Sequence, residues 1–220
     1  MNTTMKRTTN TTIRLLVAAM LWLSAGSLMA DAAGDVAHLQ QRWAEVNYQL
    51  EGKTRLSAFD QLLVDAKGMV TANPGSAELL IWSGIIKSTY AGAKGGLGAL
   101  SLAKASKADL EQAMALNADA LQGSAYTSLG ALYYSVPGWP VGFGDDDKAE
   151  ELLLKALELN PDGIDSNYFY ASFLINQDRN EEARPYLLKA QKAPGRPGRE
   201  VADSGRQKEI LAALQEIDGK

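Results

Sequence analysis

Eight residues in the second half of the chain are the best candidates for binding chemistry. They combine aromatic rings with short hydroxyl, amide and carboxylate side chains: Thr127, Tyr134, Trp139, Phe143, Asp165, Tyr168, Ser172 and Asn176. Tyrosine offers a large contact area and a hydrogen-bond donor at low entropy cost, which suits a peptide or another polar partner. The alternative is that the tyrosines only fill gaps between packed elements.

Reaction chemistry finds little support in the sequence. There is no cysteine, and the single histidine is His38, so a Ser-His-Asp triad would need that residue. Asp145, Asp146 and Asp147 lack the alternating ligands and closing glutamate of a calcium loop, and helix capping explains them. The stretch 92–98 contains a lysine among glycines but lacks the order of a phosphate loop. We therefore expect no enzyme activity, no metal and no cofactor.

The elements that would position the eight residues are indicated by an internal repeat. Two stretches share one pattern 34 residues apart: Ala149, Leu153 and Ala156 recur as Ala183, Leu187 and Ala190. This spacing puts the three residues of each stretch on one helix face, with alanines where another helix approaches closely. A 34-residue period of two helices is typical of the tetratricopeptide repeat (TPR). The sequence predicts an all-α, right-handed solenoid of TPR-like hairpins.

Two repeats contain extra residues between their helices. Gly84 and Ala113 are 29 residues apart and Gly130 and Ala156 are 26 apart, against 19 between the equivalent Ala171 and Ala190. The pattern predicts two enlarged loops, at 91–98 and 137–144, on one edge of the solenoid. The second loop contains Trp139 and Phe143, which either fold back as a plug or contact a partner.

The first 30 residues read as an export signal. Lys6, Arg7 and Arg14 precede an uncharged apolar stretch at 15–28, and Ala30 or Ala32 offers a cleavage position. The alternative is an uncleaved membrane anchor. The expected mature domain, 31–220, comprises an N-terminal helix pair at 31–74, repeats at 75–194 and a closing helix at 199–218. We expect it in a bacterial periplasm.

The mature chain is acidic. Without the three basic residues of the signal, 19 Lys and Arg remain against 26 Asp and Glu, a net charge of −7. This balance argues against nucleic acid or an anionic membrane surface as the partner.

Several motifs resemble a known family. The runs 129–134 (LGALYY), 136–140 (VPGWP), 148–150 (KAE) and 95–98 (GGLG) look like exported proteobacterial TPR proteins. They are more distantly similar to the T component of tripartite ATP-independent periplasmic (TRAP) transporters. The resemblance implies docking onto a periplasmic solute-binding protein, and a hydrophobic channel for a ligand. Members of that family are lipoproteins, whereas this chain has no cysteine for a lipid anchor.

Two functional hypotheses follow. The leading one is a periplasmic protein-interaction module, whose partner is an envelope protein, a solute-binding protein or a second copy of the chain. The alternative is a carrier that holds a small hydrophobic ligand in the concave groove or in an oligomeric channel, walled by Tyr133, Tyr134, Trp139 and Phe143.

Overall fold

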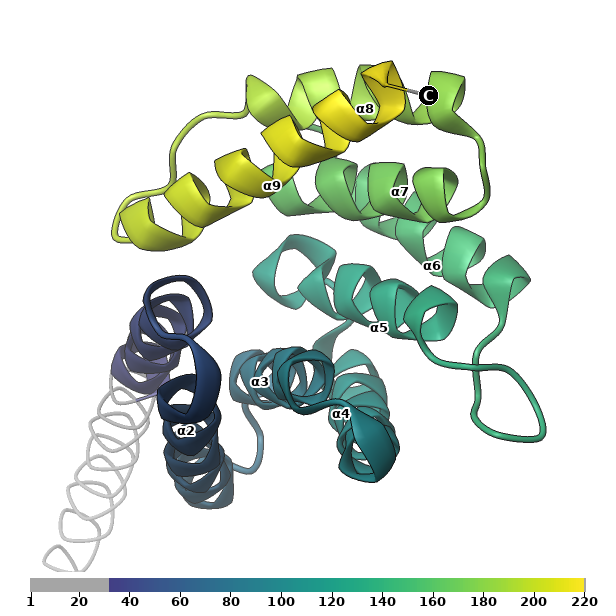
Figure 1. Ribbon diagram of the computed structural model, residues 1–220. Coiled ribbons are helices and arrows are strands. Elements are labelled where there is room, and N and C mark those ends of the chain that lie inside the picture. Colours follow the sequence, from purple (N-terminus) through teal and green to yellow (C-terminus); the bar gives the residue numbers. More distant parts are fainter. Residues whose placement is uncertain (1–31, 220) are drawn as a thin grey trace, which may run out of the picture.

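Residues 32–219, which this computed structural model describes, form helices, turns and loops, with no strand among them (Figure 1). The all-α prediction is confirmed for this part of the chain, whereas the predicted export signal lies outside it. After a first helix at residues 32–49 come α2 (Gly52–Ala72), α3 (Ala77–Lys94), α4 (Gly96–Asn117), the 3-10 turn η1 (Ala120–Gly123), α5 (Ser124–Ser135), α6 (Asp146–Leu159), α7 (Ile164–Asn176), α8 (Asn180–Gln191) and α9 (Glu200–Asp218).

The helices pair as successive hairpins. Helix α3 packs along α4, α5 along α6 and α7 along α8, and the second helix of each pair also packs on the first helix of the next. The first helices of neighbouring pairs contact one another as well, from α3 to α5 to α7 to α9. This nested order is the TPR-like arrangement that the 34-residue period predicts. The handedness of the solenoid stays a prediction.

Small residues allow the two helices of a hairpin to approach closely. A Cβ at Gly84 in α3 would lie 2.7 Å from Cγ of Leu110 in α4, and a Cβ at Gly130 in α5 would lie 2.7 Å from Cγ of Leu153 in α6. The sequence pattern placed both glycines at small-residue positions of the repeat, and the packing explains why.

Exchanging Gly130 for alanine should therefore destabilise the fold. We expect a loss of about 1–3 kcal/mol in the free energy of unfolding, because the new methyl group overpacks the α5–α6 contact. Gly68, exposed in the middle of α2 with nothing within 4 Å of a built Cβ, is the matched control. Gly68→Ala should stabilise the protein by about 0.5–1 kcal/mol through backbone entropy. Urea unfolding of both variants measures the difference, and equal effects would contradict the close approach.

The prediction of an enlarged loop at 91–98 is wrong. The glycine-rich stretch 91–98 is not a long connection, because α3 continues to Lys94 and α4 begins at Gly96. The turn consists of Gly95, and both Gly95 and Gly96 have φ of 62°, a left-handed conformation that glycine adopts without steric cost. The extra residues of this repeat lengthen its two helices. The second enlargement, between the end of α5 and the start of α6, is a loop as predicted.

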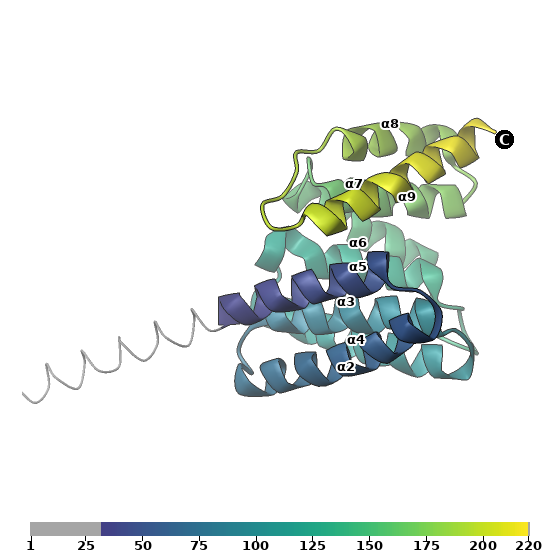
Figure 2. The ribbon, with the colours of Figure 1, turned by 60° about the vertical axis from the view of Figure 1, so that its left-hand side comes forward.

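The C-terminal helix does more than cover the end of the stack. Helix α9 packs on α7 and α8, and its N-terminal half also reaches the first helix, which lies beside it in Figures 1 and 2. Ala202 of α9 joins the apolar cluster of Trp43 and Ala44, and the Tyr48 hydroxyl donates to Glu209 over 3.4 Å. We call this contact between the first helix and α9 the seam. It joins the two ends of the described stack.

None of the described helices combines the length and hydrophobicity needed to span a membrane.

Candidate functional site

The inner face of the stack lines a half-open cavity of about 1110 Å³. Its wall is built from residues of the first helix, α3, α4, α5, α7 and α9. The turn before α7, the edge of the 136–145 loop and the connection between α8 and α9 complete it. The part of the wall that comes from α3, α4, α5 and the residue after α5 contains the apolar residues Ile85, Ala99, Leu100, Ala103, Leu132 and Val136. The part that comes from α7, α9 and the connection before α9 contains the charged residues Asp165, Arg196, Arg199 and Arg206. A cavity that combines apolar walls with a few grouped polar side chains is the usual form of a ligand site.

Asp165 is at the centre of the charged part of the wall. Arg206 donates from Nε to Asp165 Oδ1 over 2.9 Å, and Arg196 donates from Nη1 to Asp165 Oδ2 over 2.6 Å. Arg206 is further held by Glu209 and lies over the rings of Tyr168 and Phe169, at 4.3 and 4.6 Å from their centroids. This cluster connects α7 with α9 and with the segment before it.

The electrostatic consequence is a strongly ionised carboxylate. Burial alone would raise the pKa of Asp165, but the guanidinium groups of Arg206 and Arg196 outweigh it and lower the pKa to about 2. Asp165 is thus fully charged at neutral pH, and the two arginines that contact it are neutralised by it and by Asp203 and Glu209.

Four of the eight candidate residues lie on α7, and their environments differ. Asp165 lines the cavity. Tyr168 is covered by Arg206 of α9, and the Ser172 hydroxyl donates to the Tyr168 carbonyl over 2.9 Å. Asn176 is exposed at the C-terminal end of the helix. The structure thus does not bring these four into one surface, because α9 lies across the helix.

On α5, Thr127 is buried and lines the cavity. Tyr134 packs against Phe173, with ring centroids 5.9 Å apart, and burial raises its pKa well above the usual range. Tyr134 thus fills the gap between α5 and α7, as the alternative interpretation of the tyrosines expected. A binding role for these residues stays a prediction.

The two aromatic residues of the loop 136–145 differ: one packs back onto the fold as a plug, and the other is exposed. Phe143 folds back onto Tyr133 in an edge-to-face contact with centroids 5.6 Å apart and belongs to the apolar cluster around α4 and α5. Trp139, in contrast, is 89% exposed. The single loop is therefore a plug at Phe143 and presents an unpacked indole at Trp139.

Backbone hydrogen bonds hold this loop in shape. Gly144 N–H donates to the Pro137 carbonyl over 3.0 Å, and Asp145 N–H donates to the Tyr133 carbonyl over 3.0 Å. The Asp145 side chain then caps α6 by accepting from Lys148 N–H over 3.0 Å. This capping contact explains the aspartate at position 145.

No group of three or more His, Asp or Glu in residues 32–219 could hold a metal ion.

Comparison with solved structures finds a likeness to two crystal structures of MamA. The first is 17% identical, covers 74% of this chain and 93% of that chain, and has a TM-score of 0.44. The second is 19% identical, covers 73% and 92%, and has a TM-score of 0.34. No family model and no curated protein matches the sequence. The TPR-like arrangement is therefore inferred from the helix pairs of this chain itself.

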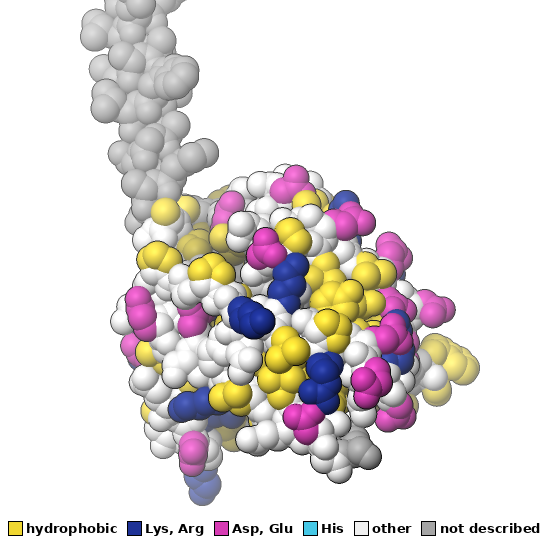
Figure 3. Space-filling view, turned by 90° about the horizontal axis from the view of Figure 1, so that it is seen from above, with side chains coloured by type: hydrophobic (Ala, Val, Ile, Leu, Met, Phe, Trp, Pro, Cys, Tyr) yellow, Lys and Arg dark blue, Asp and Glu magenta, His cyan; other side chains and the backbone are white. Residues whose placement is uncertain are grey.

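A second exposed apolar surface lies at the C-terminal end of the stack. Figure 3 views this end, where apolar side chains gather but are interrupted by Lys, Arg, Asp and Glu. Leu188 of α8 and Leu211 of α9 are the large exposed apolar residues of these two helices. This surface is less distinct than the isolated indole of Trp139.

Sequence reasoning missed the arginines of the cavity. Arg196, Arg199 and Arg206 occur within eleven residues of an acidic chain, but they read as a basic connector leading into a closing helix. The only signal in the sequence was the clustering of these arginines, because Asp165, which pairs with Arg196 and Arg206, is more than thirty residues away from them in sequence.

Proposed function

We propose that this protein is a non-enzymatic, TPR-like scaffold that docks onto a protein partner through the loop 136–145, with Trp139 as the anchor. The supporting observation is the 89% exposure of an indole on a loop that is held by backbone hydrogen bonds and packed at Phe143. A preformed loop loses little conformational entropy on binding, and tryptophan is enriched among the residues that dominate interface energies.

The chemistry of the loop indicates the surface it would fit. Trp139 is followed by Asp145, Asp146 and Asp147, all exposed. The partner would need an apolar pocket for the indole with basic residues at its rim. A periplasmic solute-binding protein or an envelope assembly factor is our proposed partner class. It rests on the export signal read from residues 1–30 and on the family resemblance of the loop motif.

Affinity capture from envelope extract tests this proposal. The wild-type chain should retain a protein that Trp139→Ala loses at least tenfold, because truncating an anchor tryptophan removes about 2 kcal/mol or more of binding free energy. Val64→Ala on α2, which also truncates an exposed apolar residue, is the matched control and should retain the partner.

Thermal melting separates docking from folding. Trp139→Ala should melt like the wild type, whereas Phe143→Ala should lose about 1–3 kcal/mol, because it removes a packed ring. Unchanged capture by Trp139→Ala would overturn the proposal, as would a Trp139→Ala variant that melts as low as Phe143→Ala.

A further inference from the structure

The cavity provides the space that a small-molecule carrier would need. At about 1110 Å³ it slightly exceeds the roughly 300–1,000 Å³ of common small-ligand pockets. The seam between the first helix and α9 helps to close it, since Gln40 and Trp43 on one side and Arg199 and Arg206 on the other all line it. A half-open site of this volume can hold a small molecule.

Arg199 is the one arginine of the cavity wall for which the described residues provide no ion pair. Arg196 and Arg206 both contact carboxylates, whereas no carboxylate of residues 32–219 lies within salt-bridge distance of Arg199. Its Nε is buried without a hydrogen-bond partner. Burial, together with the neighbouring positive charge of Arg196, lowers the pKa of Arg199, and the more distant carboxylates of Asp165 and Asp203 offset this only in part. A guanidinium left in this state gains strongly from an anion.

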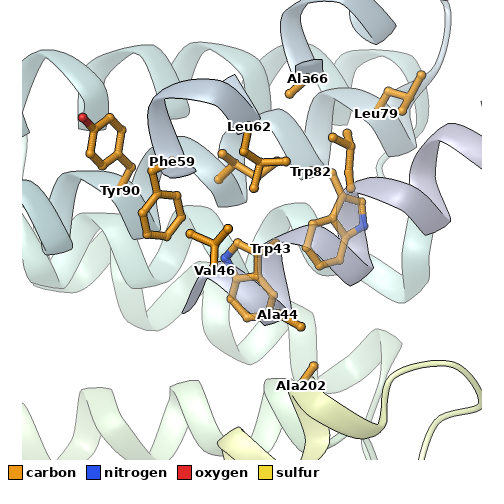
Figure 4. Packing of buried hydrophobic residues seen from close by; sticks show 12 residues of the cluster. Trp43, Ala44, Val46, Phe59, Leu62, Ala66, Leu79, Trp82, Tyr90 and Ala202 are labelled. Atoms are coloured by element: carbon orange, nitrogen blue, oxygen red, sulfur yellow. The ribbon is translucent and has the colours of Figure 1, made fainter. Parts of the chain in front are cut away.

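A second unpartnered donor lies beside it. The Arg199 guanidinium lies over the ring of Trp82, 5.0 Å from the centroid, and Trp82 lines the same cavity. Trp82 is only 4% exposed, and its Nε1 has no hydrogen-bond partner among the residues that the structure describes. Figure 4 shows Trp82 beside Trp43 in the packed cluster, so its ring is fixed in place. Buried donors without a partner are rare in folded proteins and call for an explanation.

We propose that Arg199 and Trp82 form a subsite for the anionic head of a small amphipathic molecule, a monocarboxylate whose apolar body lies along α4 and α5. The head would accept hydrogen bonds from Arg199 Nε and Trp82 Nε1, two donors of residues in the cavity wall that have no partner within residues 32–219. The body would cover the apolar wall of Ala99, Leu100, Ala103 and Leu132. A single unpaired guanidinium, with Asp165 nearby, matches one negative charge better than the two charges of a phosphate.

Trp139, the proposed docking anchor, does not line the cavity, although Val136, Pro137 and Val141 of the same loop do. The proposed subsite narrows the carrier hypothesis to a ligand with one charged end. It also assigns the charged end to residues of α3 and of the segment before α9, and not to Tyr133, Tyr134, Trp139 or Phe143.

Isothermal titration with sodium decanoate tests the subsite in the full chain. Decanamide has the same apolar body without the charge, and we expect the wild type to bind it at least tenfold more weakly. Arg199→Leu should reduce decanoate binding to the level of decanamide, while Trp82→Phe, which keeps a ring but loses Nε1–H, should weaken it several-fold. Arg184→Leu, an arginine of α8 that pairs with Asp218, is the control and should bind decanoate like the wild type.

Three results would overturn the proposal: no decanoate binding by the wild type, equal binding of decanoate and decanamide, or full retention of decanoate by Arg199→Leu. Tighter binding of decyl phosphate than of decanoate would overturn the assignment of the head as a carboxylate. Thermal melting of each variant verifies that it is folded, and Trp82→Phe gives a second readout should Arg199→Leu unfold.

Discussion

Asp165→Asn should lower the free energy of unfolding by roughly 2–3 kcal/mol at neutral pH. The substitution keeps the shape of the side chain but removes the negative charge between Arg196 and Arg206. The Arg206 side chain is only 9% exposed, so its charge cannot be compensated by water. Glu209 still pairs with Arg206, and the Asp165 side chain is 34% exposed, which keeps the expected loss below that of a fully buried pair.

The same contact predicts how stability depends on pH. The pKa of Asp165 is about 2 in the folded protein against an ordinary value of 3.8, so ionisation is easier in the folded state. The contribution of ionised Asp165 to the free energy of unfolding is fully present above about pH 4 and is lost as the pH falls through about 2. After allowing for solvent screening, we expect about 1–2 kcal/mol to be lost in this window. The stability difference between wild type and Asp165→Asn should therefore shrink between pH 5 and pH 2.

Asp162→Asn is the matched control. Asp162 is 82% exposed and pairs with Lys189 over 3.1 Å, so the same substitution should change stability by less than about 0.5 kcal/mol. Chemical denaturation at several pH values measures both variants. A wild-type-like Asp165→Asn at pH 7, or a difference that is constant from pH 5 to pH 2, would show that the cluster does not stabilise the fold as described.

The hairpins were predictable because their determinants are local. A helix face, a small residue such as Gly130 and a helix stop such as Pro161 all lie within one repeat, so the 34-residue period places them without knowledge of distant contacts. The stretch 91–98 shows the limit of this reasoning. Its glycines indicated a loop, but the helices of that hairpin extend to meet at Gly95, since packing of α3 along α4 overrides the low helix propensity of glycine.

The cavity chemistry was not predictable in the same way. Thr127 and Asp165 were selected as groove residues and do line the cavity, because both lie on the first helix of a repeat. Tyr134 and Tyr168 have the same register but are packed against α7 and covered by α9, respectively. The position of α9 depends on contacts such as that between Tyr48 and Glu209, which are 161 residues apart and leave no periodic trace in the sequence.

Gly205→Val should open the seam. A Cβ at Gly205 would lie 2.4 to 2.5 Å from three ring carbons of Tyr48, so a β-branched side chain there must push α9 and the first helix apart. We expect a loss of about 2–3 kcal/mol in the free energy of unfolding from overpacking. The radius of gyration in small-angle X-ray scattering should increase, because the two ends of the stack are no longer joined.

The pKa of Tyr48 shows whether the seam is the part of the protein that opens. Burial raises the pKa of Tyr48 to about 12, and the carboxylates of Glu209 and Asp165 add to this against the opposing charge of Arg206. When the seam opens, water reaches the phenol, and its pKa should return toward 10, which NMR of labelled tyrosine can follow. Ser204→Val, the same new side chain at the exposed neighbouring position, should leave both the scattering and the titration unchanged. A Gly205→Val protein that keeps the compact scattering profile and a high Tyr48 pKa would mean that α9 does not close the stack against the first helix.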